Sequence, residues 1–167
     1  MRKKLGRSTN LVQTSEPPAP DGIPVFSATF LSDNAEKSRV LDELLDAIEK
    51  SGALKTDDMG SMRLALDEAL VNAVMHGNRH DTQKKVRVFA WLSSARLSIV
   101  ISDDGAGFKE EDLPDPQAPE NLLEESGRGV ILIRGIMDEV SYWNGGATLL
   151  MTKKRGQGPG VRGQDAK

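Results

Sequence analysis

The sequence predicts one α+β domain, and three observations lead to that prediction. The chain has 167 residues, enough to bury one core and too few for two ordinary domains. Apolar residues recur at helical spacing in two consecutive stretches, 35–50 and 57–77. Strand-forming residues cluster before these stretches and again, in pairs joined by short turns, after them. Separate runs of helices and hairpin-linked strands are typical of the α+β class.

The first elements are an arm, a strand and a helix. Residues 1–23 hold several prolines among polar residues, a composition that cannot offset the entropy of ordering, so we expect a flexible arm. Val25–Leu31 is rich in strand formers. Helical spacing then predicts a helix over 35–50 that ends at Ser51-Gly52. Its apolar positions are Val40, Leu41, Leu44, Leu45 and Ile48.

The second helix carries a polar row beside its apolar stripe. We expect it to begin at Asp57 or Asp58, either of which can act as N-cap, and to end near His76-Gly77. Glu68, Asn72 and His76 follow one another at intervals of four and therefore form one row along the helix. The stripe expected to be buried is Leu66, Ala69, Leu70 and Ala73.

The second half of the chain alternates strands with one helix. Lys85–Leu92 and Arg96–Ser102 read as a strand pair. The polar stretch 104–126 is too long for an ordinary connection and is typical of a functional lid. The remaining elements expected are a helix over 129–137, a strand over 140–143, a hairpin turn at 144–146, a strand over 147–153 and a flexible tail over 156–167.

Composition excludes several classes of function. The net charge is −3, from 22 basic and 25 acidic residues, so there is no overall basic field for binding a nucleic-acid backbone. The chain has no cysteine, which excludes disulfides and thiolate zinc sites. Neither the apolar stretch of a secretory signal nor a membrane span is found, so we expect a cytoplasmic protein.

Glu68 and Asn72 place a carboxylate and an amide oxygen one helical turn apart. Magnesium prefers hard oxygen ligands and keeps several waters when it also binds phosphates. Asn72 therefore suits a metal and Glu68 suits a general base. Taken alone, both could equally be ordinary polar residues on the flank of a helix.

Asp103 ends an apolar strand, where an unpaired acid is costly, so it should accept a hydrogen bond from a specific donor such as the amine of adenine. Gly105 and Gly107 permit positive φ and close approach of the backbone to a base or a phosphate chain. An ordinary Asp-Gly turn is the alternative. The adjacent Asp104 is expected to be solvated.

Gly127-Arg128-Gly129 precedes the predicted third helix, whose free N–H groups and dipole favour an anion. Arg128 could add a charged contact to a terminal phosphate. A glycine loop with a solvated arginine is the alternative. No Walker-type phosphate loop is present. We expect His76 to be a local helix cap and His80 to lie in a loop.

Taken in order, these blocks resemble the N, G1 and G2 boxes of the Bergerat-type (GHKL) ATP-binding fold, and more narrowly the anti-sigma factor serine kinases. The blocks are 66–77, 101–108, 127–129, 137–140 and 146–148. The resemblance covers Val25 to Lys154 and implies an ATP-binding kinase domain over 24–155. It also implies a two-layer sandwich of a mixed, mostly antiparallel sheet with about three helices on one face.

The resemblance implies a role for each matched residue. Glu68 would be the catalytic base, Asn72 would coordinate Mg²⁺ on the phosphates, and Asp103 would accept from the adenine amine with Thr148 nearby. Arg39 matches a position through which similar proteins contact partners. Glu125 departs from some relatives, which carry a basic residue there, so the contact to the terminal phosphate would come from Arg128 or from another residue. The pocket and lid would be shaped by Gly105, Gly107, Gly127 and Gly129.

Partners follow from the resemblance as well. It implies an ATP-dependent protein-serine kinase that phosphorylates a STAS-type anti-sigma-factor antagonist and sequesters a sigma factor. Similar proteins are often homodimers, and an N-terminal edge strand would be available for pairing. Two alternatives remain: a regulator that binds ATP without transfer, and a kinase of another partner-switching pathway.

Overall fold

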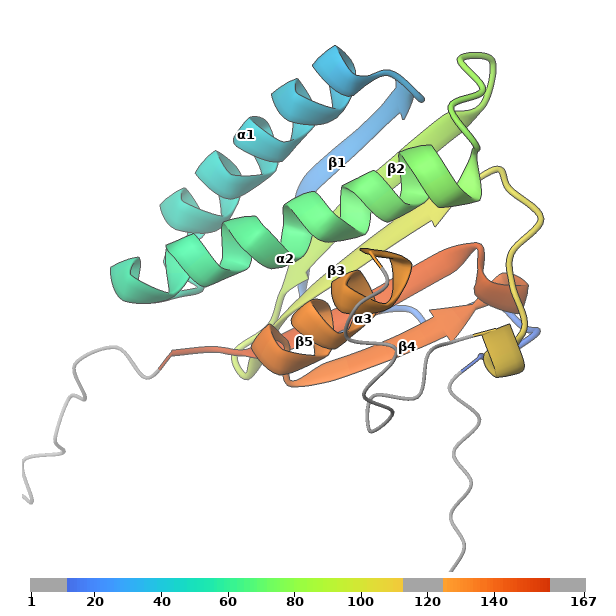
Figure 1. Ribbon diagram of the computed structural model, residues 1–167. Helices are drawn as coiled ribbons and strands as arrows, with labels where there is room; N and C mark the ends of the chain where they lie inside the picture. The colour runs from blue at the N-terminus through green and yellow to red at the C-terminus, as the bar shows by residue number, and fades with distance from the viewer. Residues whose placement is uncertain (1–11, 113–124, 157–167) are drawn as a thin grey trace, which may run out of the picture.

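The computed structural model describes residues 12–112 and 125–156, and it confirms the predicted α+β class. Five strands form one sheet in the order β1-β2-β3-β5-β4, with every neighbouring pair antiparallel. The three helices cover one face of this sheet (Figure 1). The strands are β1 (Ile23–Leu31), β2 (Lys85–Leu92), β3 (Arg96–Asp103), β4 (Glu139–Trp143) and β5 (Thr148–Lys154), and the helices are α1 (Asn34–Ser51), α2 (Met59–Val71) and α3 (Glu125–Ile136).

Helix α1 is capped at both ends by side-chain and backbone chemistry that the sequence signals. The Asp33 carboxylate accepts from the backbone N–H groups of Ala35 and Glu36, at 2.9 and 3.1 Å. Gly52 ends the helix in the left-handed region, with φ 68°. The helix therefore begins and ends within one residue of the predicted 35–50 range.

Helix α2 is one part of a composite element rather than one regular helix. A 3-10 turn, η1 (Thr56–Asp58), precedes it, and one π-helical turn, η2 (Asn72–Gly77), follows. In the wider turn the Asn78 N–H donates to Ala73 O at 2.8 Å. Turns of this kind concentrate at functional sites, and this one begins at Asn72, a predicted site residue.

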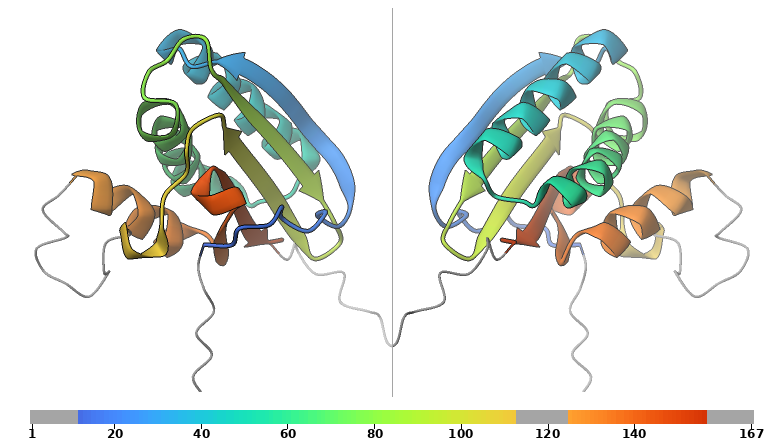
Figure 2. Two further views of the ribbon diagram at one scale, coloured as in Figure 1. Left: turned by 90° about the vertical axis from the view of Figure 1, so that its right-hand side faces the viewer. Right: turned by 90° about the vertical axis from the view of Figure 1, so that its left-hand side faces the viewer.

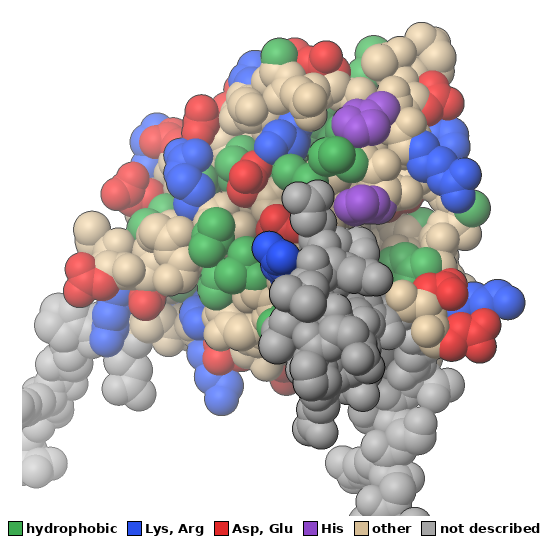
Figure 3. Space-filling view, in the orientation of Figure 1, with side chains coloured by type: hydrophobic (Ala, Val, Ile, Leu, Met, Phe, Trp, Pro, Cys, Tyr) green, Lys and Arg blue, Asp and Glu red, His purple; other side chains and the backbone are tan. Residues whose placement is uncertain are grey.

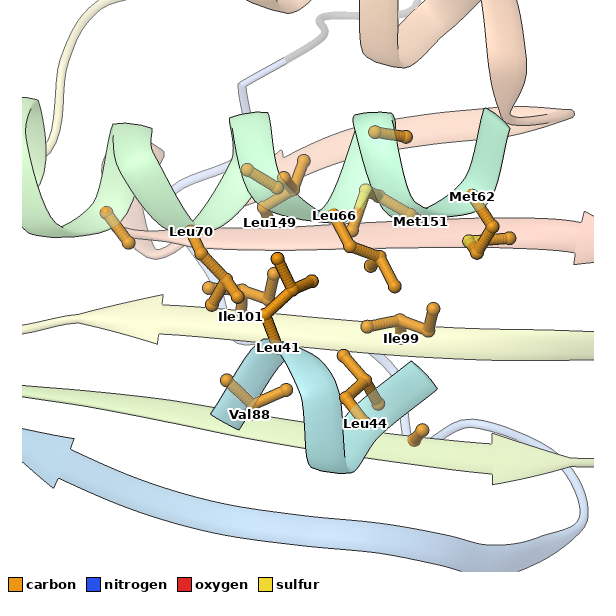
Figure 4. Packing of buried hydrophobic residues seen from close by; sticks show 14 of the residues in the cluster. Leu41, Leu44, Met62, Leu66, Leu70, Val88, Ile99, Ile101, Leu149 and Met151 are labelled. Atoms are coloured by element: carbon orange, nitrogen blue, oxygen red, sulfur yellow. The ribbon is translucent and has the colours of Figure 1, made fainter. Parts of the chain in front are cut away.

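The core lies between the helical layer and the sheet. Figure 4 shows side chains from α1 and α2 meeting those of β2, β3 and β5 in one continuous cluster. All four residues predicted as the buried stripe of the second helix belong to it. This packing fixes α2 against the sheet centre, so the row that starts with Glu68 lies along the helix flank. The labelled residues are Leu41, Leu44, Met62, Leu66, Leu70, Val88, Ile99, Ile101, Leu149 and Met151.

Asn78 is a buried polar link between three segments. Its Nδ2 donates to Ser32 Oγ at 2.6 Å and to Lys85 O at 2.9 Å, and its Oδ1 accepts from the Asp104 N–H at 2.8 Å. The side chain therefore ties the ends of β1 and β2 to the loop that follows β3.

The Asn78→Ala variant should lose roughly 2–4 kcal/mol of unfolding free energy, because it leaves buried donors and acceptors without partners. Urea unfolding measures the loss. Asn34→Ala, at an exposed position in the first turn of α1, is the matched control and should change stability little. Equal stability of the two variants would contradict this role of Asn78.

Residues 12–22 lie against the sheet. Val12 forms a parallel bridge with Tyr142, at the outer edge of β4. At the other end of the segment, Asp21 pairs with Arg96 at 2.9 Å. Between these contacts the chain passes along the sheet face away from α1 and α2 (Figure 2), where Val100 is buried although its side chain alternates with those of the core. The rest of the expected arm, 1–11, lies outside the described residues.

The predicted lid and the predicted C-terminal tail lie largely outside the residues that the structure describes. Most of the predicted lid lies in residues 113–124, and the predicted C-terminal tail lies almost entirely in 157–167. Within the described ranges, none of the helices combines the length and the apolar character needed to cross a membrane.

Candidate nucleotide site

A cavity of about 260 Å³ lies between the C-terminal end of α2 with η2, the carboxyl end of β3 and the start of β5. Its size is near the lower end of the range for small-molecule sites, and its lining combines apolar side chains with a few polar ones. It lies where predicted blocks far apart in the sequence converge. The lining residues are Ala69, Asn72, Ala73, His76, Gly77, Ile101, Asp103, Gly107, Phe108, Asp112, Tyr142, Gly146, Ala147 and Leu149.

Asp103 is held at the cavity wall by backbone contacts on two sides. Its Oδ1 accepts from the Gly105 N–H at 2.8 Å, and its own N–H donates to Ala147 O at 2.9 Å. A Cβ at Gly77 would collide with the carboxylate, so the helix end approaches this acid as closely as only glycine permits. The carboxylate is thereby fixed in one orientation with an oxygen left for a further donor.

Burial raises the pKa of Asp103 to about 6, and the charge of Asp104 adds to this effect. The Gly105 hydrogen bond and the charge of Lys84 oppose it. A carboxylate whose charge is poorly solvated is stabilised when a ligand donates a hydrogen bond to it. This property fits the predicted contact with the amine of adenine.

Aromatic and glycine residues form the wall opposite α2. The rings of Phe108 and Tyr142 meet edge to face, with centroids 4.9 Å apart. Gly107 has φ +73°, and a Cβ on it would collide with Gly145 O. This close approach brings the Phe108 N–H to Gly145 O at 2.8 Å. The two rings are tilted 74° from each other and give this wall an apolar aromatic surface beside the glycine backbone, which suits contact with a base.

Asn72 and Glu68 come from adjacent turns on one side of α2. Asn72 lines the cavity, whereas Glu68 lies one turn earlier, in contact with α3. A Cβ at Gly129 would collide with the Glu68 carboxylate, which places that carboxylate directly against the backbone of α3. Of the predicted row of Glu68, Asn72 and His76, the last two therefore line the cavity together with Asp103, and Glu68 lies beside it.

Helix α3 begins earlier than the sequence predicts. The expected start was Gly129, with Gly127 and Arg128 in the preceding loop, but the helix begins at Glu125 and includes all three residues. The two glycines made an early start look unfavourable because glycine weakens helices. Packing on α2 compensates, since the absence of a Cβ at Gly129 gives room to Glu68. Arg128 is exposed on this helix.

Thr148 is not brought into the cavity. Its hydroxyl lies 3.0 Å from Ser102 Oγ and accepts from Asn144 Nδ2 at 2.9 Å. Side chains alternate along β5, so its neighbours Ala147 and Leu149 line the cavity instead. The block that carries Thr148 is therefore at the site, but the register of the strand turns this side chain to the other face.

Three further polar residues singled out in the sequence are His76, Asp104 and Arg39. His76 was expected to be a local cap, yet it lines the cavity; Figure 3 shows both histidines of the chain on this face. Asp104 is exposed as expected but paired: it accepts from Arg87 and from the Lys85 N–H, both at 2.8 Å. Arg39 is exposed on α1 and bonded to Glu36 and Glu43.

The two aromatic residues that line the cavity, Phe108 and Tyr142, are among the lining residues that sequence reasoning did not predict. Phe108 directly follows the Gly105–Gly107 block, and an aromatic residue beside a glycine turn could have indicated a base-binding wall. Tyr142 lies in a short strand whose period-two pattern indicates one buried face but not a cavity. Nothing in that local pattern distinguishes it from an ordinary core residue.

This arrangement of sheet, helices and glycine-walled cavity defines an ATP-binding domain of the Bergerat type. Residues 30–153 match the histidine kinase-like ATPase domain family. Since the match covers more than half of the chain, the chain belongs to this family.

Within this family, the chain is similar to individual serine-protein kinases. The serine-protein kinase RsbW of Bacillus mycoides (strain KBAB4) is 35% identical over 104 residues, which cover 58% of this chain and 64% of the relative. The serine-protein kinase RsbW of Bacillus subtilis (strain 168) is 33% identical over 105 residues, covering 58% and 65%. The chain therefore spans just under two thirds of the length of the relatives it matches.

Proposed function

We propose that the protein is an ATP-dependent protein-serine kinase that acts as an anti-sigma factor. It phosphorylates a serine of a STAS-type antagonist and, in another nucleotide state, binds a sigma factor in the cytoplasm. The similarity to RsbW serine-protein kinases supports this proposal. The observation that supports it best is that Asn72 and Asp103 line one cavity, while Glu68 lies one helical turn before Asn72 with its carboxylate against Gly129 of α3.

The residues present fit ATP and Mg²⁺. Asp103 offers a carboxylate that can accept a hydrogen bond from the base. Beside it, Gly77 and Gly105 lie in close contact, and the absence of side chains there lets a flat base approach the backbone. Asn72 offers an amide oxygen, a ligand type that Mg²⁺ accepts together with phosphates and water. The magnesium ion would neutralise charge on the phosphates.

Glu68 is the proposed catalytic base. It accepts the proton of the acceptor serine hydroxyl while the serine oxygen forms a bond to the γ-phosphorus and the bond from that phosphorus to the bridging oxygen breaks, releasing ADP. Proton transfer of this kind contributes about 10²–10⁴-fold to a rate, and positioning supplies much of the remainder. Contact with Gly129 holds the Glu68 carboxylate in one place.

The test is transfer of labelled γ-phosphate to a serine of a STAS-type antagonist from the same organism, with Mg²⁺ present. The proposal predicts one phosphoserine per antagonist. Normal ATP binding without transfer would instead indicate a regulator that binds ATP only. Transfer to a partner unconnected with any sigma factor would indicate another partner-switching pathway.

Gly129→Ala should slow this transfer by about 10²-fold, because the new Cβ displaces the Glu68 carboxylate. The fold should survive, since the far end of a glutamate side chain can move and alanine favours the helix. Gly135→Ala is the matched control in the same helix, where a Cβ would meet nothing within 4 Å. Single-turnover rates and thermal unfolding check both variants, and unchanged transfer in Gly129→Ala would argue against Glu68 as base.

A further inference from the structure

Residues 12–15, here called the docking segment, are bonded to the turn between β4 and β5. The Gln13 N–H donates to Tyr142 O at 2.8 Å. In return, Gln13 O accepts from the Gly145 N–H and Ser15 O accepts from the Asn144 N–H, both at 2.9 Å. The segment thus extends the β4 edge and continues over η5 (Asn144–Gly146), the turn that follows it.

This turn has an unfavourable backbone conformation. Asn144, Gly145 and Gly146 all have positive φ, at 52°, 65° and 99°. A non-glycine residue in the left-handed region costs about 1 kcal/mol or more, and such a conformation persists only where its surroundings hold it. The docking segment supplies the acceptors for two consecutive N–H groups of this turn.

The same turn is part of the cavity wall. Gly146 and the following Ala147 line the cavity, and Gly145 O accepts from the Phe108 N–H. Gly107 packs so closely on Gly145 that a Cβ would not fit between them. Movement of the turn would therefore move Phe108, whose ring contacts that of Tyr142.

We propose that the docking segment is a positioning element of the nucleotide site. One backbone hydrogen bond to Tyr142 of β4 and two to Asn144 and Gly145 of η5 hold the turn in the conformation that fixes Gly107 and Phe108, and release of the segment lowers affinity for ATP. This inference rests on the proposed ATP site. It gives the proline-containing arm a role: the arm joins the docking segment to β1 along the open sheet face, where the Asp21–Arg96 pair anchors it.

The test compares three full-length variants. Gln13→Pro removes one N–H donor and places a ring where the segment meets Tyr142 O. Thr14→Ala changes only an exposed side chain of the same segment. Ala19→Pro introduces the same residue type at an exposed position of the arm between two prolines, outside the three bonds. Amide exchange at Phe108, Asn144 and Gly145 is measured without ligand, and ATP affinity is measured with Mg²⁺.

The proposal predicts that Gln13→Pro speeds exchange at all three amides and weakens ATP binding on the order of tenfold, whereas both controls behave as wild type. Slow exchange in β3 shows that the sheet stays folded. Unchanged exchange at Asn144 and Gly145 would overturn the proposal, as would faster exchange there with Phe108 and ATP affinity unaffected. If the wild type binds no ATP, the proposed function fails, and exchange at Phe108 still decides whether the docking segment holds the cavity wall.

Discussion

Asp103→Asn is expected to weaken ATP binding by about 100-fold. A charged acceptor facing a buried donor contributes about 1.5–3 kcal/mol, and each 1.4 kcal/mol is a factor of ten in affinity. Asparagine keeps an oxygen for the Gly105 N–H but turns its NH₂ group toward the position proposed for the adenine amine. Two donors would then face each other.

The contribution of Asp103 to the stability of the fold should decrease as the pH rises. Because the pKa of Asp103 is raised to about 6 in the folded chain, the native state binds more protons than the unfolded state between about pH 4 and 6. The contribution of Asp103 to stability is therefore fully present below that window and is lost as the pH rises through about 6. Asparagine carries no such loss, so the stability difference should move in favour of Asp103→Asn as the pH rises.

Asp104→Asn is the matched control. The hydrogen bond from Arg87 holds the pKa of Asp104 below its usual range, so its stabilising contribution is present near neutral pH and is lost as the pH falls. ATP affinity should stay close to wild type, since Asp104 is exposed and does not line the cavity. Calorimetric titration with ATP and urea unfolding at pH 4.5 and 7 check both variants. Equal ATP affinity of the two would refute the adenine contact.

Glu68→Gln is expected to reduce phosphoryl transfer by about 10²–10⁴-fold with little change in ATP affinity. Glutamine has the same shape and can keep the contact with Gly129, but it cannot accept the serine proton. Single-turnover transfer from labelled ATP measures the rate, and calorimetry measures the affinity. A reduced rate at normal affinity is the expected combination.

Asp67→Asn is a suitable control for Glu68→Gln because it changes the adjacent residue on the same helix. Asp67 pairs with Lys37 of α1 at 2.6 Å and does not line the cavity. Its loss should cost at most about 1 kcal/mol of stability, as for other partly exposed ion pairs, and leave transfer unchanged. Comparable transfer by both variants would remove Glu68 from the role of base.

The fold could be predicted largely from local chemistry. The apolar spacing in α1 and α2 and the Asp33 and Gly52 caps act within a few residues, so their effects can be read from the sequence. The convergence of the Glu68, Asp103 and Gly129 blocks was expected only because the joint order resembled a known family. The glycine contacts give a physical reason for this convergence. A Cβ at Gly77 would overlap the Asp103 carboxylate, and a Cβ at Gly129 would overlap that of Glu68.

What could not be predicted depends on tertiary contacts. The early start of α3 depends on packing against α2, and the orientation of Thr148 depends on the register of β5 with β3. The backbone bonds of the docking segment involve residues about 130 positions away in the chain and no distinctive side chain. Composition alone therefore suggested an arm without partners for a segment that contacts the β4–β5 turn.

An ¹H–¹⁵N NMR titration with ATP and Mg²⁺ tests the central claim, that the cavity between α2, β3 and β5 is the nucleotide site. We expect the largest chemical-shift changes at the backbone amides of Asn72, Gly77, Gly105 and Phe108. In the Asp103→Asn variant the changes at the same ATP concentrations should be much smaller. Saturable shifts confined to another surface, such as the groove between α1 and α2 that is lined by Lys37, Asp42 and Arg63, would contradict it.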